Sequence, residues 1–342
     1  MRNRRVYLRY LTHYLPETVL DNRFFERIMD TSNAWIRDHV GIVERRFMSD
    51  YRGSFPVFEI GRRAVEKLLA TSAFELAGVD VLLSCSCNDD LQFPGPGNML
   101  SEHFGLRVPA FHVKNGCSSV AYGLEVARGL LQLGSYRNVL MVTGEPFTHF
   151  ADYADRSSSI LFGDAATALV VSTEPGPFEL LEVGLGGRGS RVIHATAPGA
   201  AVERSIHDVH PDACEPDYWG GVTPAWGRFQ QAGGAVFDFV VNEMPGEIQA
   251  FVRGLGLSIG DFEWFIAHQA NLPMLEALCE TLGVPPERHL YNVDRNGNTS
   301  SAGWVTVLSE ALEDKRFGPG ERILVSVFGA GLGWGNLVLR KT

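Results

Sequence analysis

The two halves of this chain repeat one pattern of apolar and polar residues. Residues 79–87 resemble residues 262–270 in this pattern, and residues 162–171 (FGDAATALVV) resemble residues 328–339 (FGAGLGWGNLVL). Each pair lies at a comparable place in its half of the chain. This self-similarity predicts two related α/β units that meet near the middle of the sequence.

Apolar runs typical of strands alternate with helical patterns along the whole chain, which favours a layered α/β architecture. The repeat is interrupted at residues 173–177 (TEPGP), where proline and glycine break the pattern. We therefore expect one unit over residues 1–174 and a second over residues 175–342. A chain of 342 residues with 45% hydrophobic content can bury a large core.

Residues 186–234 follow neither a helical nor a strand pattern. An irregular stretch of this length is usually a functional loop or a disordered segment. Four aromatic residues in it, Trp219, Trp226, Phe229 and Phe237, favour an ordered loop.

The charge and hydropathy of the chain argue against two classes of partner. The formal net charge is −10, which disfavours binding to nucleic acid or to an anionic membrane surface. No stretch approaches the roughly eighteen apolar residues that a membrane span needs. The N-terminus is basic but lacks the uninterrupted apolar segment of a signal peptide, so we expect a first strand there.

Cysteine usage indicates a reducing compartment. The odd number of cysteines and the size of the chain argue against stabilisation by disulfide bonds. Because disulfides are rare in the cytoplasm, we expect a cytoplasmic protein. Cys85 and Cys87 have the wrong spacing for a zinc knuckle and lie in an apolar run, so we predict that both are structural. The five cysteines are Cys85, Cys87, Cys117, Cys214 and Cys279.

Cys117, His268 and Asn298 each lie where an apolar run or a turn leads into a helical pattern. A thiol at the start of a helix is exposed to the positive end of the helix dipole, which favours the thiolate. Three polar residues at three element ends could converge on one pocket. A thiolate beside a histidine and an asparagine suits acyl transfer through a thioester.

Each of these residues also has a simpler interpretation. A single cysteine is more often a small core residue than a nucleophile, and a histidine at a strand end is usually a hydrogen-bonded polar group. An Asn-Gly-Asn run such as residues 296–298 is ordinarily a turn. The flanking sequence decides between these interpretations.

Several motifs resemble those of the thiolase superfamily, and together they are similar to beta-ketoacyl-[acyl-carrier-protein] synthase III. The likeness covers essentially the whole chain. Residues 117–128 more closely resemble the synthase III-like enzymes of secondary metabolism, such as those of quinolone biosynthesis. The segments that carry the resemblance are residues 14–19, 30–36, 41–46, 156–171, 268–271, 294–300 and 327–335.

This resemblance implies a thiolase-like αβαβα five-layered sandwich of two related halves. It also implies that Cys117 is the nucleophile and that the backbone N–H groups of Cys117 and Ala330 bind the oxyanion. His268 and Asn298 would donate hydrogen bonds to the thioester oxygen of a malonyl extender. Ala330 departs from the family, which usually has glycine at this position.

The resemblance further implies a coenzyme A thioester as substrate, with no metal or other cofactor, and a homodimer. Trp35 would stack on the adenine, Arg156 would flank it, and Asn271 would contact the pantetheine arm. Phe93 would cross the dimer interface into the acyl pocket of the partner. His39 replaces a family arginine, which weakens one phosphate contact at neutral pH.

The surface that would bind an acyl carrier protein departs further from the family. Asp238 and Pro273 occupy positions where the family carries Lys and Arg, and Glu276 and Glu280 make the following helix acidic. Carrier proteins are acidic, so like charges would oppose docking. One interpretation is that the usual carrier is not the partner or docks at another surface. The other is that residues have changed without consequence on an ordinary solvent-exposed surface.

Two activities remain open from the sequence. In the first, Cys117 accepts an acyl group from a coenzyme A or carrier-protein thioester and passes it on by decarboxylative Claisen condensation in a specialised, polyketide- or fatty-acid-like pathway. In the second, an acyl or malonyl group passes to a hydroxyl or amine of a small molecule, with His268 as general base. A non-catalytic partner subunit would be expected to lack the nucleophile.

Overall fold

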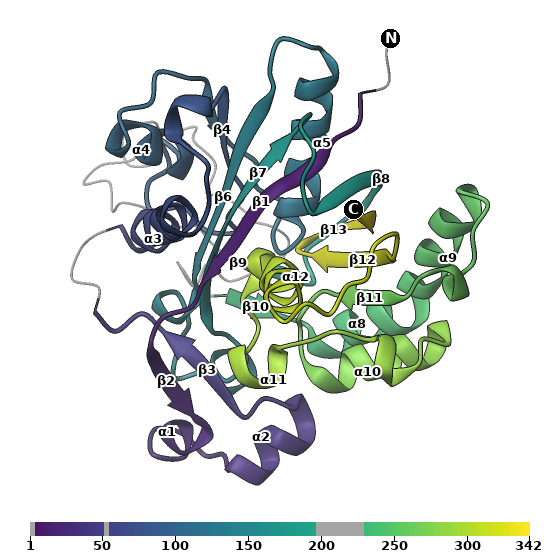
Figure 1. Ribbon diagram of the computed structural model, residues 1–342. Coiled ribbons are helices and arrows are strands. Elements are labelled where there is room, and N and C mark those ends of the chain that lie inside the picture. The colour runs from purple at the N-terminus through teal and green to yellow at the C-terminus, as the bar shows by residue number, and fades with distance from the viewer. Residues whose placement is uncertain (1–3, 51–54, 196–228) are drawn as a thin grey trace, which may run out of the picture.

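A nine-stranded mixed sheet runs through the part of the chain that the computed structural model describes, residues 4–50, 55–195 and 229–342. Its strand order is β11-β12-β13-β8-β1-β7-β6-β4-β5 (Figure 1). Its strands are β1 (Tyr7–Tyr14), β4 (Val81–Ser84), β5 (Ala110–His112), β6 (Asn138–Pro146), β7 (Asp164–Ser172), β8 (Phe178–Ser190), β11 (Trp264–Ala267), β12 (Arg322–Gly329) and β13 (Gly331–Lys341).

Two antiparallel two-stranded sheets and a set of α-helices accompany the large sheet in the described structure. The small sheets pair β2 (Thr18–Asp21) with β3 (Glu44–Phe47) and β9 (Ile193–Ala195) with β10 (Phe229–Gln231). The helices are α1 (Asn22–Glu26), α2 (Asn33–Val40), α3 (Pro56–Thr71), α4 (Pro96–His103), α5 (Ser119–Gln132), α6 (Arg156–Ser159), α8 (Gly233–Asp238), α9 (Met244–Gly254), α10 (Leu272–Leu282), α11 (Val293–Asn296) and α12 (Gly303–Glu313).

Strand directions repeat on the two sides of the large sheet. β4 and β6 are parallel and β6 and β7 antiparallel, just as β11 and β12 are parallel and β12 and β13 antiparallel. β1 pairs along its length with β7 but meets β8 only at Tyr7 and Leu8. The internal repeat seen in the sequence therefore corresponds to equivalent strands. The division at residue 174 falls between β7 and β8 and stays a prediction.

Alternate side chains of the strands fill three separate apolar layers. Residues of β4, β6, β12 and β13 that face inward pack against α5 and α12 in a central layer. The opposite faces are covered by α3 and α4 in one half and by α8, α9 and α10 in the other. Strands covered on both faces are expected to be apolar throughout, as β6 and β7 nearly are. The two halves of the sheet, joined at the short β1–β8 contact, form the two β layers between these three sets of helices, which gives the predicted five-layered αβαβα sandwich.

Part of the irregular stretch falls within β8, β9, β10 and α8, and Phe229 packs edge-on against Phe162 with ring centroids 4.9 Å apart. Trp219, Trp226 and Cys214 lie outside the described residues. Within the described ranges, no helix is both long enough and apolar enough to cross a bilayer.

Replacing Leu124 by alanine should lower the free energy of unfolding by about 2–5 kcal/mol, because this fully buried side chain fills the central layer. Leu133, at the end of the same helix, is 73% exposed, so Leu133→Ala is the matched control and should change stability little. Urea unfolding followed by circular dichroism measures both. Equal effects of the two substitutions would contradict the central position of α5.

Candidate active site

Cys117, His268 and Asn298 all line one cavity of about 190 Å³. The nucleophile candidate comes from the N-terminal half, and the other two come from the C-terminal half. Phe328 and Gly329, at the end of β12, also line this cavity. The structure therefore brings together the three residues on which the sequence prediction rests.

Cys117 lies in a tight turn between β5 and α5. The helix begins at Ser119, so the thiol precedes the first helical residue by two positions and is not at the helix start itself. Gly116 adopts a φ of +55°, and a Cβ there would lie 2.9 Å from the nitrogen of Ala330. Both the left-handed conformation and this close approach require glycine. The turn thus sets Cys117 against the segment that follows β12.

The surroundings of Cys117 favour its thiolate. Its pKa is lowered, chiefly by a hydrogen bond with the side chain of Cys87; burial opposes the shift, and a hydrogen bond from Ser300 adds to it. The Ser300 hydroxyl oxygen lies 3.4 Å from the Cys117 sulfur. A thiolate stabilised in this way is the reactive form of cysteine.

The structure corrects the placement of Cys85 and Cys87 relative to the strand that the apolar run predicts. The strand β4 ends at Ser84, so Cys85 and Cys87 follow the strand rather than lie within it. Cys85 is buried in the central apolar layer, as predicted for a structural thiol. The structural role of Cys87 stays a prediction.

His268 follows β11 and is held by its backbone, whose N–H donates to the carbonyl of Ser326 at 2.8 Å. The ring packs edge-on against Phe328, with centroids 4.9 Å apart. Burial lowers the pKa of His268 to about 4, so the imidazole is neutral at pH 7. Its Nδ1 atom is buried and has no hydrogen-bond partner among the described residues. A neutral imidazole can donate a hydrogen bond without bringing a permanent charge.

Asn298 is fixed by backbone and side-chain hydrogen bonds. Its N–H donates to the carbonyl of Leu161 at 2.8 Å, and its carbonyl accepts from Gly163 at 3.2 Å. Its Oδ1 accepts from the backbone N–H of Ser300 at 2.8 Å, which leaves the amide NH₂ group as the donor toward the cavity. Ser300 has a φ of +52°, a conformation that non-glycine residues adopt at a cost and that often occurs at functional sites.

Glu145 and Ser301 lie next to Ser300, which contacts Cys117, and were not predicted from the sequence. One carboxylate oxygen of Glu145 accepts from the backbone N–H of Cys87 at 2.8 Å and also contacts the Ser301 hydroxyl. Burial raises the pKa of Glu145 well above its usual range. The sequence signal for Glu145 was its position near the end of a largely apolar strand. A glutamate is rarely buried in such a strand unless its carboxylate is paired.

The turn between β12 and β13 lies directly against Cys117. A Cβ on Gly329 would be 2.6 Å from the Cys117 nitrogen. The neighbouring residue, Ala330, approaches Gly116, so the two backbone segments lie side by side. An oxyanion site needs two such backbone donors held close together. Oxyanion binding by Cys117 and Ala330 stays a prediction.

Trp35, Arg156 and His39 form a stack near the cavity. The His39 ring is nearly parallel to the indole, with centroids 4.3 Å apart, and the Arg156 guanidinium lies 4.6 Å from the indole centroid. Arg156 also donates to the carbonyl of Asp30 at 2.7 Å. His39 lines the cavity, whereas Trp35 and Arg156 do not.

Asn271 and Phe93, the other two residues predicted for substrate binding, differ in whether they line the cavity. Asn271 lines the cavity, and its side-chain oxygen caps α10 by accepting from Met274 at 3.0 Å. Phe93 is 81% exposed and is not among the residues lining the cavity. Its insertion into a partner's pocket stays a prediction.

Within the described ranges, no group of three or more His, Cys, Asp or Glu side chains could hold a metal ion. The features present are a five-layered αβαβα sandwich and a cysteine with a lowered pKa beside a neutral histidine and an asparagine amide. Together they define a thiolase-like enzyme, and the role of Cys117 as its nucleophile stays a prediction.

Comparison with known proteins specifies the family. The family model described as 3-oxoacyl-[acyl-carrier-protein] synthase III matches residues 111–189, and the model of its C-terminal part matches residues 253–341. The beta-ketoacyl-[acyl-carrier-protein] synthase III of Deinococcus deserti is 35% identical over 323 residues, which cover 94% of this chain and 87% of that protein. This chain belongs to the beta-ketoacyl-[acyl-carrier-protein] synthase III family and is an acyltransferase.

Solved structures agree with this assignment. The synthase III of Thermus thermophilus superposes with a TM-score of 0.84 at 32% identity, covering 97% of this chain and 98% of that one. The priming beta-ketosynthase of the R1128 polyketide biosynthetic pathway superposes with a TM-score of 0.82 at 26% identity, covering 100% of this chain and 98% of that one.

Gly329→Ala should slow the acylation of Cys117 by a thioester about 100-fold, because the new methyl group would displace the Cys117 N–H from the predicted oxyanion site. Gly246→Ala is the control, since a Cβ there meets no atom within 4 Å. Acylation is followed by mass spectrometry of the intact protein. An unchanged rate in Gly329→Ala would argue against the backbone of Cys117 as an oxyanion donor.

Proposed function

We propose that the protein accepts an acyl group from a coenzyme A thioester onto Cys117 and passes it to a malonyl thioester by decarboxylative Claisen condensation. The observation that carries this proposal is the single cavity lined by Cys117, His268 and Asn298. The cavity combines a nucleophile, which the first half-reaction requires, with two neutral hydrogen-bond donors, which the second half-reaction requires.

In the loading step, the Cys117 thiolate attacks the thioester carbonyl carbon. The oxyanion that forms is bound by the backbone N–H groups of Cys117 and Ala330, whose segments lie against each other. Collapse of the tetrahedral intermediate releases the donor thiol, which takes up a proton, and leaves the acyl group on Cys117.

In the condensation step, His268 and Asn298 donate hydrogen bonds to the thioester oxygen of the malonyl group. Carbon dioxide leaves, the resulting enolate carbon attacks the acyl carbonyl, and the Cys117 thiolate is released. A histidine with a pKa of about 4 is suited to this role because it stays neutral. The same pKa makes His268 a weak general base near pH 7, which disfavours transfer to a hydroxyl or amine.

The proposed setting is a specialised, polyketide- or fatty-acid-like pathway in the cytoplasm, with a homodimeric enzyme. Likeness to a priming ketosynthase of a polyketide pathway supports this setting, and a catalytic thiol suits a reducing compartment. The stack of Arg156 and Trp35 supports recognition of a nucleotide-bearing donor, because both groups can stack on a purine.

Removing Asn298 should separate the two half-reactions. Asn298→Ala should slow carbon dioxide release from a malonyl thioester by about 100- to 1000-fold, because one donor to the developing enolate is lost. Acylation of Cys117 should change little in this variant. His268→Ala should slow the second step as well, and Cys117→Ala should abolish loading. Carbon dioxide release and intact-protein mass are measured in parallel.

Two results would contradict this scheme. An acyl adduct on Cys85, Cys214 or Cys279 would exclude Cys117 as the nucleophile. A stable malonyl adduct on Cys117 of the wild-type enzyme, with no carbon dioxide released, would favour malonyl or acyl transfer to a heteroatom.

The negative charge of the predicted docking surface should make a coenzyme A thioester a better substrate than a thioester of a typical acidic carrier protein. Asp238 is exposed at the end of α8, and exposed Glu276 lies on α10, which begins beside Pro273. Asp238→Lys combined with Pro273→Arg should raise the rate with a carrier-bound substrate, and high salt should remove the gain.

Glu75→Lys is the control for this experiment, because Glu75 is exposed in the N-terminal half, outside the predicted docking surface. Steady-state rates with carrier-bound and coenzyme A substrates at two salt concentrations give the comparison. A wild-type preference for the carrier, or no effect of the double substitution, would disprove the docking hypothesis.

A further inference from the structure

We propose that Arg45 is a positioning residue for Asn298, because its buried guanidinium holds residues 160–163, the segment with which the backbone of Asn298 pairs. This inference rests on the proposed function only in taking Asn298 as a hydrogen-bond donor in the condensation step. Arg45 belongs to β3 and is not among the residues that line the cavity, so it would act through Asn298 rather than on the substrate.

The Arg45 side chain is fully buried, and its guanidinium is held by neutral oxygen atoms. Its Nη1 atom donates to the side-chain oxygen of Asn22 at 2.8 Å and to the carbonyl of Leu20 at 3.4 Å. Its Nη2 atom donates to the carbonyl of Ile160. The guanidinium carbon lies 4.4 Å from the ring centroid of Phe25. One buried cation therefore links β2 and α1 to the segment after α6.

Burying the Arg45 guanidinium opposite neutral oxygen atoms costs free energy, because these atoms replace the lost hydration less well than a carboxylate would. Burial lowers the pKa of Arg45 to about 9, so the group is still charged at pH 7. An apolar side chain of similar length would fill the same space without this cost. The cost indicates that the guanidinium is retained for its geometry, since a planar fork of donors can hold two segments at a fixed separation.

Ile160 directly precedes the residues that pair with Asn298. The backbone N–H of Asn298 donates to the carbonyl of Leu161 at 2.8 Å, and the N–H of Gly163 donates to the carbonyl of Asn298 at 3.2 Å. Phe162, between these two residues, forms an isolated parallel bridge with Asn298. Leu161 and Phe162 also line the cavity. Fixing Ile160 therefore fixes both the backbone of Asn298 and part of the cavity wall.

The stem of Arg45 lies where these two segments meet. Cβ atoms placed on Gly163 and Gly297 would lie 3.0 Å and 3.1 Å from the Cβ of Arg45. Gly297 also has a φ of +67°, and a Cβ there would lie 2.9 Å from the carbonyl oxygen of Leu161. The absence of side chains at both positions allows this close approach. Arg45 is thus packed against the residue before Asn298 and against Gly163, which pairs with it.

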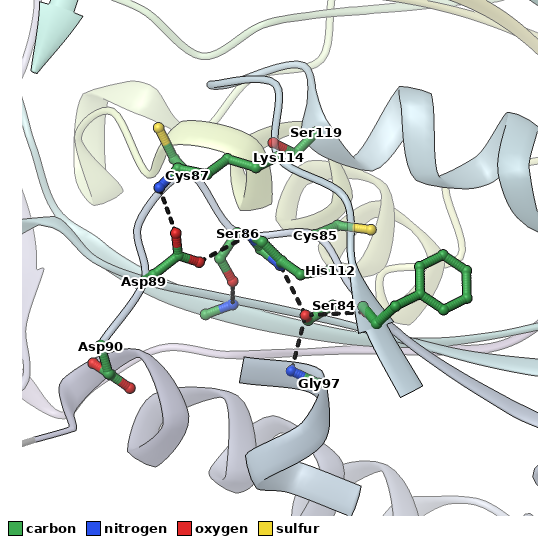
Figure 2. A network of polar contacts seen from close by, with 12 residues as sticks. Ser84, Cys85, Ser86, Cys87, Asp89, Asp90, Gly97, His112, Lys114 and Ser119 are labelled. Carbon is green, nitrogen blue, oxygen red and sulfur yellow. Dashed lines mark hydrogen bonds and ion pairs between the residues drawn. The ribbon is translucent and has the colours of Figure 1, made fainter. Parts of the chain in front are cut away.

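The nucleophile side of the cavity has a polar anchor of its own (Figure 2). Asp89, in the loop after β4, lies 2.6 Å from the Nζ atom of Lys114 and 3.1 Å from the Nε2 atom of His112. Lys114 and His112 precede Cys117 in the chain, so this cluster holds the segment that leads to the nucleophile. Because different polar groups hold the two sides of the cavity, loss of Arg45 should leave the loading of Cys117 nearly unchanged.

The test is a double-mutant cycle on the release of carbon dioxide from a malonyl thioester. Arg45→Met removes the donors but keeps a long apolar side chain. In the wild-type background it should slow carbon dioxide release about 10- to 100-fold, because a small displacement of a catalytic group is costly. In the Asn298→Ala background it should add little, since the group that Arg45 positions is already absent. Acylation of Cys117, followed by intact-protein mass, should stay close to the wild-type rate in Arg45→Met.

Arg63→Met is the matched control, because the Arg63 side chain is only 17% exposed and donates to the hydroxyl of Tyr14 at 2.9 Å, but it lies on α3. Both rates should stay at the wild-type level in this variant. If Arg45→Met does not fold, Arg45→Lys provides the second test. A lysine keeps the charge but cannot span Asn22 and Ile160 with a planar fork, so the same selective loss should appear at a smaller size.

Three results would overturn the role of Arg45. They are a wild-type rate of carbon dioxide release in Arg45→Met, equal slowing of carbon dioxide release and acylation, and the same fold-loss in the wild-type and Asn298→Ala backgrounds. The last two are expected of a purely structural residue, whose loss does not act through Asn298. Asn298→Ala that releases carbon dioxide at the wild-type rate would instead refute the proposed function, and the inference on Arg45 would fail with it.

Discussion

The contact between the β12–β13 turn and the backbone of Cys117 is the constraint on which the site depends. Because Gly329 has no side chain, the C-terminal half can closely approach Cys117 of the N-terminal half. Asn298 makes a second connection by pairing with the Leu161–Gly163 segment. Neither half contains a complete site. The central layer of α5 and α12 holds the two halves at the required separation, which links core packing to catalysis.

The polar groups of the site are buried in forms that are neutral or paired. His268 is neutral because burial disfavours its charged form, and the raised pKa of Glu145 has the same cause. Cys117 is the exception, because hydrogen bonds with Cys87 and Ser300 lower its pKa and so favour its thiolate. A site that favours one thiolate and holds neutral donors suits a reaction in which negative charge moves between sulfur and a thioester oxygen.

Local patterns predicted a layered α/β architecture and placed Cys117, His268 and Asn298 at the ends of elements, where an apolar run or a turn leads into a helix. The five-layered sandwich and the roles of the three residues were implied by the family resemblance instead. Ser300 could not be predicted from local patterns. Its importance depends on a contact with Cys117 between segments distant in the sequence. The strand before Cys85 also ends earlier than the apolar run indicates, at Ser84.

The neutral state of His268 also links catalysis to stability. Its pKa is about 4 in the folded protein and about 6.5 in the unfolded chain, so the unfolded chain takes up the proton first as the pH falls. The resulting loss of stability begins below about pH 6.5 and is complete near pH 4, where it is on the order of 3 kcal/mol. His289, buried on the chain segment after α10, has the same low pKa and acts in the same direction. The burial that keeps His268 a neutral donor at pH 7 therefore sets an acid limit for the whole fold.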